Sequence, residues 1–382
     1  MRMILNETSY FGAGCRAELS AEMNRRGYKK AFVVSDRDLV KFGVAKFVTD
    51  ELDKGEFSYV IYDDVKANPT IKNVQTGYAL FKDFAPDVII AVGGGSVIDT
   101  AKAIGIIATN PDFYDVKSLE GVADTKNKCF PIIAFATTSG TAAEVTINYV
   151  ITDEEAGRKL VCVDPNDIPV IAFNDADMMK SMPKGLTAAT GMDALTHAIE
   201  GYITKGAHAL SDLLCWNSIK LIADNLATAV FDGANDGARE GMAMGSYVAG
   251  MAFSNVGLGI VHSMAHPLGA RFDIAHGVAN ALLLPFVMEY NMPYCKKKYA
   301  DIARAMGVDV KGLDEDSAAI AAIDAVKTLS KAIGIPQTLK EIGIKESDLE
   351  MLSADAIIDP CTGGNPAPVT QADILEIYKK AL

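Results

Sequence analysis

The chain has 382 residues, with 36 Lys or Arg against 49 Asp or Glu, so its formal net charge is −13. An acidic chain of pI near 4.9 has no bulk attraction for nucleic acid or for an anionic membrane surface, so neither is an expected partner. At roughly 100–200 residues per domain the length predicts two domains, and no apolar run approaches the ~20 residues that span a bilayer.

The first half of the chain alternates short apolar runs with stretches of helical periodicity, such as 40–52 and 71–84. Continuous apolar runs are typical of strands covered on both faces, as in a parallel α/β sheet. This alternation therefore predicts the β-α-β order of a nucleotide-binding sheet. The expected strands of this sheet are 30–36, 57–62, 88–92 and 131–135, and a further set, 149–152, 159–163 and 170–173, is expected to form an antiparallel appendage.

The second half of the chain is expected to be helical, with no strand after Phe173. The change in pattern predicts a domain boundary near residue 183, with an α/β domain over 1–183 and an all-α domain over 184–382. The segments with helical periodicity are 186–203, 209–227, 238–253, 278–292, 318–333 and 371–382.

A glycine-rich loop, Gly93-Gly94-Gly95-Ser96, follows the apolar strand 88–92 directly and leads into a helix. Glycines let backbone N–H groups approach a phosphate, and the helix N-terminus adds a favourable dipole. The pattern is not the G-x-G-x-x-G fingerprint, because Ile98 occupies the position of the third glycine. The alternative to a phosphate-binding loop is therefore an ordinary strand-to-helix turn.

A second polar loop, 137–141, follows the strand 131–135, again at the carboxyl edge where open sheets bind ligands. Two such loops on one edge favour a bound dinucleotide. Asp36, at the end of the first strand, could accept hydrogen bonds from a ribose 2′-OH and would repel a 2′-phosphate, which favours NAD over NADP. The alternative for Asp36 is a solvated aspartate in a turn.

All five histidines fall between His197 and His276. Asp193 and His197 have the i, i+4 spacing that places two side chains on one helix face, and His262 and His266 repeat it. One Asp and several His, with no Cys, describe an N/O site for a divalent transition metal.

The residues that flank these pairs are apolar, so a bare charged pair would be costly to bury without a metal. Spacing alone does not identify which three histidines bind, although His208, in a polar segment, is expected to be exposed and outside the site. The six cysteines lie far apart without a C-x-x-C motif, and the N-terminus turns polar too early for a secretory signal. Free thiols and a cytoplasmic location are therefore expected.

Four ordered motifs together resemble the iron-dependent (group III) alcohol dehydrogenases over essentially the whole chain. The resemblance implies a Rossmann-like dinucleotide-binding domain followed by an all-α metal-binding domain, a fold shared with the dehydroquinate synthases. The motifs are Gly93-Gly94-Gly95-Ser96…Asp99, Thr137-Thr138-Ser139-Gly140-Thr141…Glu144-Val145-Thr146, Gly191-Met192-Asp193-Ala194…His197-Ala198-Ile199-Glu200, and His262…His266…His276-Gly277.

The resemblance implies that Asp193, His197, His262 and His276 bind Fe²⁺, with Zn²⁺ also possible, and that His266 is catalytic near the nicotinamide. It further implies an NAD site and a substrate pocket. The residues implied for NAD are Asp36, Asn68, Gly94, Gly95, Ser96, Val97, Ile98, Thr137, Thr138, Thr141, Lys159 and Leu186, and those for the substrate are Asn148, Phe253, Leu258 and Cys361.

Within the family the chain is most similar to the branch that interconverts lactaldehyde and 1,2-propanediol. The implied reaction is hydride transfer between NAD(H) and a small aldehyde or diol, with the metal polarising the carbonyl oxygen. A homodimer that pairs through the N-terminal strand is also implied. One departure is Ala367, where the family often has Arg.

Three alternatives stay open. A 1,3-propanediol or butanol dehydrogenase of the same family is the nearest. An NAD- and metal-dependent lyase resembling dehydroquinate synthase would need several Lys or Arg for a polyhydroxylated acid, but 262–276 offers only Arg271. A non-catalytic NAD-responsive binding protein would leave the metal residues unexplained.

Overall fold

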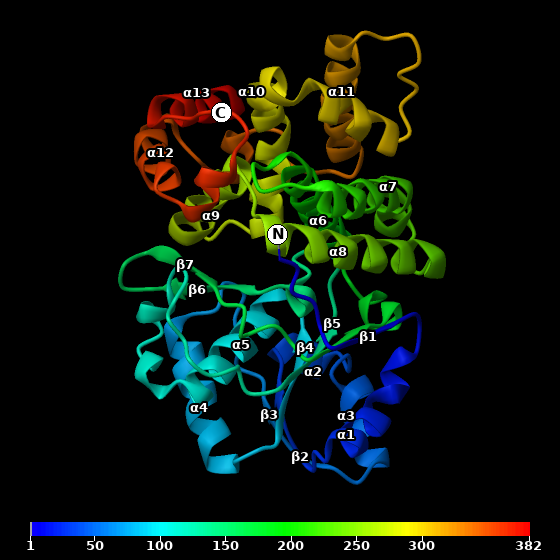
Figure 1. Ribbon diagram of the computed structural model, residues 1–382, viewed down its shortest axis with the longest axis vertical. Helices are drawn as coiled ribbons and strands as arrows, with labels where there is room; N and C mark the ends of the chain where they lie inside the picture. Colours follow the sequence, from blue (N-terminus) through cyan, green and yellow to red (C-terminus); the bar gives the residue numbers. More distant parts are fainter. Residues whose placement is uncertain (1) are drawn as a thin grey trace. The chain divides into compact units, whose positions relative to one another are not determined.

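The computed structural model describes residues 2–382, which form two compact units (Figure 1). The first unit runs to Thr138 and resumes over Ala142–Ser181, and the second comprises Ser139–Thr141 and Met182–Leu382. The first is an α/β unit and the second is helical, so the fold class expected from the sequence is confirmed.

The tripeptide Ser139–Thr141 belongs to the second unit although both of its chain neighbours belong to the first. Gly140 explains this, because its carbonyl accepts a hydrogen bond from Ser246 Oγ (3.2 Å). A Cβ atom on Gly140 would also lie only 2.8 Å from Cβ of Thr190, so the backbones are closely packed here. The chain therefore passes between the two units three times, after Thr138, after Thr141 and after Ser181.

The first unit is built on a six-stranded sheet in the order β1-β8-β5-β4-β2-β3, with every neighbouring pair parallel. All six residues of β4, in the middle of the sheet, are buried, as its continuous apolar run predicts. The strands are β1 (Thr8–Phe11), β2 (Lys30–Val34), β3 (Ser58–Tyr62), β4 (Val88–Gly93), β5 (Ile132–Ala136) and β8 (Ile171–Asn174).

Helices cover both faces of this sheet (Figure 1). In β2, Ala31 and Val33 pack in the core beneath α1 (Leu19–Arg26) and α3 (Lys46–Lys54). The alternate residues Phe32 and Val34 pack in a second core beneath α4 (Ile71–Phe84) and α5 (Gly95–Thr109). Because successive strand side chains point to opposite faces, a strand buried on both sides is apolar throughout.

One strand assignment from the sequence is wrong. The run 170–173 is not part of an antiparallel appendage, because β8 pairs in parallel with β5 and β1 inside the main sheet. Its four residues are all buried, which is what a central strand requires. The appendage is a single antiparallel hairpin of β6 (Asn148–Asp153) and β7 (Arg158–Val163).

The single helix expected over 40–52 is also wrong. The segment forms two helices, α2 (Arg37–Lys41) and α3, separated at Gly43, whose φ of +80° is a left-handed conformation that ends a helix. The short strand β1 was not predicted from the residue pattern. Its four residues are half-buried or exposed, so they lack the apolar run that marks the other strands.

The second unit contains eight α-helices among its described residues, and no single helix of residues 2–382 is long and apolar enough to cross a membrane. Helix α6 lies among α7, α8 and α10 and is buried almost throughout, because its Ala and Gly residues allow close approach. The helices are α6 (Lys184–Ile203), α7 (Ala209–Phe231), α8 (Asp236–Val256), α9 (Ile260–Phe272), α10 (His276–Ala305), α11 (Glu315–Ala332), α12 (Leu349–Ile357) and α13 (Gln371–Ala381).

Helix α10 is two helices joined at a bend. Cys295 leaves the helical region (φ −146°, ψ 32°), two residues after Pro293, which lacks the N–H that a helix interior needs. The helix end expected at residue 292 corresponds to this break. The short helix α12 was not anticipated from periodicity.

Asp167, in the first unit, is a buried carboxyl group whose two oxygens have no hydrogen-bond partner among the described residues. Burial raises its pKa well above the ordinary value, and the charge of Lys102 only partly opposes the shift. Burial also raises the pKa of Asp99 to about 6 and that of Glu144 to about 7. The folded first unit therefore favours the protonated form of three acids.

A carboxyl whose pKa is raised by folding binds more protons in the folded state, so stability falls as the pH rises above its ordinary pKa toward the raised value. We expect the contribution of these three acids to the free energy of unfolding to fall from about pH 4 upward. Asp167→Asn should make the slope of the unfolding free energy against pH less negative by about 1.4 kcal/mol per pH unit, and it should stabilise the protein at pH 8. Denaturant unfolding at pH 5.5, 7 and 8 measures both effects.

Asp124→Asn, at an exposed aspartate of the same unit (87% exposed), is the matched control and should leave the slope unchanged. An Asp167→Asn protein with the wild-type slope would contradict the prediction.

Candidate metal centre and cofactor loops

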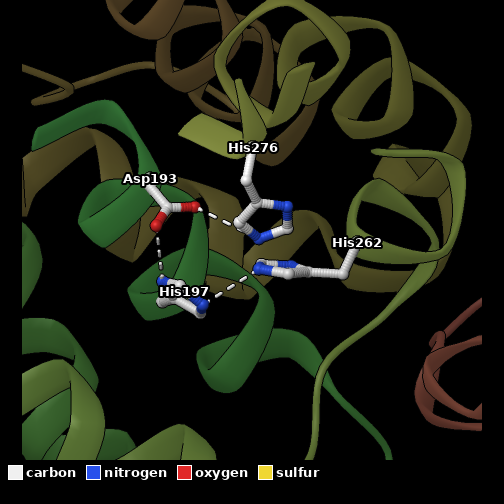
Figure 2. Close-up of side chains that lie close together, drawn as sticks. All are labelled: Asp193, His197, His262 and His276. Carbon is white, nitrogen blue, oxygen red and sulfur yellow. Dashed lines mark hydrogen bonds and ion pairs between the residues drawn. The ribbon is translucent and has the colours of Figure 1, made fainter. Parts of the chain in front are cut away.

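Four side chains from three helices converge in the second unit (Figure 2). Helix α6 supplies Asp193 and His197 from adjacent turns, His262 lies in the first turn of α9, and His276 begins α10. One ligand atom from each lies within 4.8 Å of all the others. The i, i+4 spacing of Asp193 and His197 places both side chains on one face of α6, and the four residues that come together are those that the resemblance implies as metal ligands.

The distances fit a single transition-metal ion. Nε2 of His262 lies 2.9 Å from Nε2 of His197, and Oδ1 of Asp193 lies 3.7 Å from Nε2 of His276. Ligand atoms around a tetrahedral ion with bonds of about 2.1 Å lie about 3.4 Å apart, which falls between these two values. Three imidazoles and one carboxylate suit a divalent ion such as Fe²⁺ or Zn²⁺.

Two of the three imidazoles are held in the neutral form that metal binding needs. Burial lowers the pKa of His197 and lowers that of His262 well below the ordinary value, so both rings are neutral. The ring of Phe253 stacks on His197, with centroids 4.1 Å apart and planes at 16°. His276 is the most exposed ligand, with 34% of its side chain accessible, so the site opens on its side.

Glu200, one turn after His197 on α6, orients His262. Its Oε2 accepts a hydrogen bond from Nδ1 of His262 (2.6 Å), and its Oε1 accepts one from the backbone N–H of Val261 (2.7 Å). With a proton on Nδ1, the Nε2 lone pair faces the other ligands. Burial raises the pKa of Glu200 to about 8, and a bound cation beyond His262 would oppose that shift by favouring the carboxylate.

Asn280, one turn after His276 on α10, contacts three of the four ligands. Its Nδ2 donates to Oδ1 of Asp193 (2.7 Å) and lies 3.1 Å and 3.0 Å from Nε2 of His262 and His276. The residue is fully buried, and its Oδ1 has no hydrogen-bond partner among the described residues. Asn280 is therefore a buried polar side chain in direct contact with the candidate metal ligands.

His266 lies beside the quartet and not within it. Its ring is nearly parallel to that of His276, with centroids 5.5 Å apart, and its Nδ1 donates to Oδ2 of Asp359 (2.7 Å). Cys361 completes a second cluster with these two residues. His208, expected to be exposed, is half-buried and caps α7, where its Nδ1 accepts from the N–H of Ser211.

The two glycine-containing loops meet at the end of β4 in the first unit. A Cβ atom on Gly94 would lie 2.9 Å from Oγ1 of Thr138, and the N–H of Thr137 donates to the carbonyl of Gly93 (3.1 Å). Gly95 and Ser96 open α5, so their amides are in the helix turn that attracts anions. The side chains of Val97 and Ile98 are buried in the core, and these residues could contact a ligand only through their backbones.

Three other predicted cofactor residues of the first unit have local partners. Nζ of Lys159 donates to Oδ1 of Asn68 (2.7 Å), so the structure brings these two together. Asp36 caps α2, because its Oδ1 accepts from the N–H of Leu39 (2.8 Å). The remaining two, Thr141 and Leu186, lie in the second unit, where Leu186 is 43% exposed in the first turn of α6.

The four residues predicted for the substrate pocket are divided between the units. Phe253 lies against a metal ligand, and the N–H of Cys361 donates to Asp359 (2.8 Å). Leu258 is buried in the loop before α9, and Asn148 is half-buried at the start of β6 in the first unit. Ala367, the departure from the family pattern, is buried, and its carbonyl accepts from Asn365.

Sequence reasoning assigned no role to Glu200, Asn280 or Asp359. Glu200 and Asn280 follow predicted ligands by three and four residues, so helix spacing could have placed them beside the metal centre. Asp359 is 93 residues from His266, and no local pattern connects the two.

Comparison with known proteins assigns both halves of the chain to one family. Residues 6–176 match the family described as "Iron-containing alcohol dehydrogenase", and residues 187–382 match "Fe-containing alcohol dehydrogenase family, C-terminal". Together these matches span most of the chain.

Individual relatives match this chain over its full length. The chain is 55% identical over 380 residues to "Lactaldehyde reductase" of Escherichia coli (strain K12), covering 100% of this chain and 99% of the relative. The crystal structure of a 1,3-propanediol oxidoreductase is similar with a TM-score of 0.97 and 41% identity, covering 100% and 99%. A sulfoacetaldehyde reductase from Bifidobacterium kashiwanohense in complex with NAD⁺ is similar with a TM-score of 0.87 and 28% identity, covering 100% and 98%.

We expect Glu200→Gln to weaken metal binding by about 10–100-fold, the usual effect of losing a partner that orients a ligand. In the variant, the amide oxygen of the glutamine should still accept the hydrogen bond from the Val261 N–H, so its NH₂ group faces Nδ1 of His262. Because two donors cannot share that bond, the ring proton moves to Nε2, the nitrogen that must bind the metal. Competition with a chelator at neutral pH measures the dissociation constant.

Glu289→Gln, at an exposed glutamate of α10 that pairs with Lys327, is the control and should bind metal as the wild type does. Unchanged affinity in Glu200→Gln would show that Glu200 does not set the His262 tautomer.

Proposed function

The chain belongs to the iron-containing alcohol dehydrogenase family, and on that premise we propose that it reduces lactaldehyde to 1,2-propanediol with NADH, reversibly. The observation that carries the proposal is the 55% identity to the lactaldehyde reductase of E. coli over the full length of both chains. The converging Asp193, His197, His262 and His276 support the metal-assisted chemistry. A 1,3-propanediol dehydrogenase is the nearest alternative, and it is less favoured because such relatives are 41% identical.

Asp193, His197, His262 and His276 would hold Fe²⁺, with Zn²⁺ as the other ion that this donor set accepts. When bound, the ion supplies a redox-silent positive charge that polarises a carbonyl oxygen and stabilises the negative charge produced by hydride transfer. Neutral imidazoles matter here, because three neutral ligands and one carboxylate leave a divalent ion with a net positive charge.

NAD would bind to the loops and helix ends identified above. The contact of Gly94 with Thr138 supports a cradle for phosphates at the first turn of α5. The carboxylate of Asp36 would accept bonds from a ribose, and the cation of Lys159 supports an anionic or hydroxyl-rich ligand nearby. The proposed set is Asp36, Asn68, Gly94, Gly95, Ser96, Val97, Ile98, Thr137, Thr138, Thr141, Lys159 and Leu186.

Phe253, Leu258 and Cys361 would shape the substrate pocket, and Asn148 would hydrogen-bond the 2-hydroxyl of a short hydroxyaldehyde. The stacking of Phe253 on His197 supports an apolar wall beside the metal centre. His266 would accept the hydroxyl proton when the diol is oxidised, and the resulting imidazolium would return it to the oxygen when the aldehyde is reduced. Its position beside His276 supports this role.

Residues 1–183 would thus form the NAD-binding domain and 184–382 the metal-binding and substrate domain. A homodimer is also proposed, paired through the N-terminal strand. The position of β1 at one edge of the sheet supports such pairing, because an edge strand can hydrogen-bond a strand of another chain. The cytoplasmic location stays a prediction.

His262→Ala should lose at least about 100-fold in metal affinity, because it removes a ligand and leaves Glu200 without its partner. NADH-dependent reduction of lactaldehyde should fall with it. Metal analysis after anaerobic purification, together with NADH oxidation, measures both.

His208→Ala, which removes a histidine that caps a helix outside the site, should keep its metal and its activity. The site assignment would be wrong if His262→Ala retained both metal and activity. If the wild type oxidised no NADH with any short aldehyde, the dehydrogenase proposal itself would fail.

Asp36→Ser should shift the cofactor preference toward NADP. Serine can still cap α2, but it removes the negative charge that would repel a 2′-phosphate. We expect the ratio of kcat/KM for NADPH to that for NADH to rise at least about tenfold. Asp38→Ser, at an exposed position of the same helix, should leave the ratio unchanged. An unchanged ratio in Asp36→Ser would remove Asp36 from the cofactor site.

A further inference from the structure

We infer that Asp359 is a positioning residue that fixes the tautomer of His266 and so leaves its Nε2 lone pair available to accept the hydroxyl proton when the alcohol is oxidised. The inference rests on the proton-transfer role proposed above for His266. Asp359 lies just before the short 3₁₀ helix η8 (Pro360–Gly364), whereas His266 is in the middle of α9. The fold brings the two together across 93 residues of sequence.

Both oxygens of Asp359 are engaged as acceptors. Oδ2 accepts from Nδ1 of His266 at 2.7 Å, while Oδ1 accepts from the backbone N–H of Cys361 at 2.8 Å and from Oγ of Ser263 at 3.4 Å. Only about a tenth of either side chain is accessible, 10% for His266 and 9% for Asp359. A buried carboxylate with this many donors has one stable orientation.

The hydrogen bond determines where the imidazole carries its proton. A neutral ring has one N–H, and a carboxylate can only accept, so the proton lies on Nδ1 and Nε2 has the lone pair. Burial acts to raise the pKa of Asp359, but the neighbouring His266 and the donors from Cys361 outweigh it, and the pKa lies below its ordinary value. Asp359 therefore stays an acceptor.

A metal ion at the second cluster is the other use of a carboxylate, an imidazole and a thiol. The contacts favour the hydrogen-bonded arrangement, because an ion would have to displace the proton between His266 and Asp359. Burial also raises the pKa of the Cys361 thiol well above its ordinary value, which disfavours the thiolate that binds metals.

The substitution Asp359→Asn should invert the tautomer with little change of shape. The backbone N–H of Cys361 can only donate, so the amide oxygen stays on it and the NH₂ group faces Nδ1 of His266. Two donors cannot share that bond, so the ring proton must move to Nε2. His266 then presents an N–H where the wild type presents a lone pair.

The chain suits a direct measurement, because it has only five histidines. Protein labelled with ¹⁵N-histidine and loaded with diamagnetic Zn²⁺ gives one long-range ¹H–¹⁵N pattern per ring, and His266→Gln assigns the signal. We expect the Nδ1–H pattern in the wild type and the Nε2–H pattern in Asp359→Asn. With Fe²⁺ and NAD⁺, kcat for the oxidation of 1,2-propanediol should fall about 100-fold or more, with KM and metal content nearly unchanged.

Asp355→Asn is the matched control, since it makes the same change four residues earlier at a carboxylate that pairs with Arg271 on the surface. It should keep the wild-type tautomer and kcat, whereas Asp359→Glu should recover part of the lost kcat. In a His266→Gln background, Asp359→Asn should cause no further loss, because the residue acts only through His266.

Two results separate the inference from the proposed function. An Nε2–H pattern in the wild type, or an unchanged tautomer in Asp359→Asn, overturns the positioning role, and the wild-type spectrum decides this even where the variant does not fold. A wild-type kcat in His266→Gln overturns the proton-transfer role of His266 instead.

Discussion

The site in the second unit depends on one electrostatic constraint: the buried imidazoles of His197 and His262 must stay neutral while their lone pairs point at the same place. Burial is the main cause of the neutrality, since it lowers the pKa of His197 and His262, and the neighbouring histidines act in the same direction. The direction of the lone pair needs a carboxylate behind the ring, and Glu200 provides it for His262. Helix α6, which carries Glu200, also packs closely against α7, α8 and α10, and its Ala and Gly residues permit that.

A buried carboxylate bonded to Nδ1 orients the imidazole ring at both His262 and His266. The carboxylate belongs to Glu200 in the first case and to Asp359 in the second. Glu200 lies on α6 with Asp193 and His197 and holds His262 on α9, so the orienting carboxylate shares a helix with two other members of the quartet. Asp359 holds His266 from a loop that is fixed through backbone contacts. The proposed metal-binding ring of His262 and the proposed proton-transfer ring of His266 thus differ mainly in what the Nε2 atom faces.

Much of this could be predicted from the sequence, and the failures have physical reasons. Continuous apolar runs predicted β2, β4 and β5 because both of their faces are covered. The i, i+4 spacing of Asp193 and His197 predicted that these two side chains share one face of a helix, here α6. The strand β8 was misassigned because an apolar run does not encode its partner. Asp359 could not be found, since its contact with His266 spans 93 residues and depends on how η8 packs.

The tripeptide Ser139–Thr141 makes the first unit discontinuous along the chain. A fragment that ended at Ser181 would carry this tripeptide without Thr190 and Ser246, the residues against which Gly140 packs. A chimaera that joins the first unit of this chain to the second unit of a relative by a single crossover would place a foreign surface under Gly140. Recombination within this family therefore has to exchange the tripeptide together with the helices that receive it.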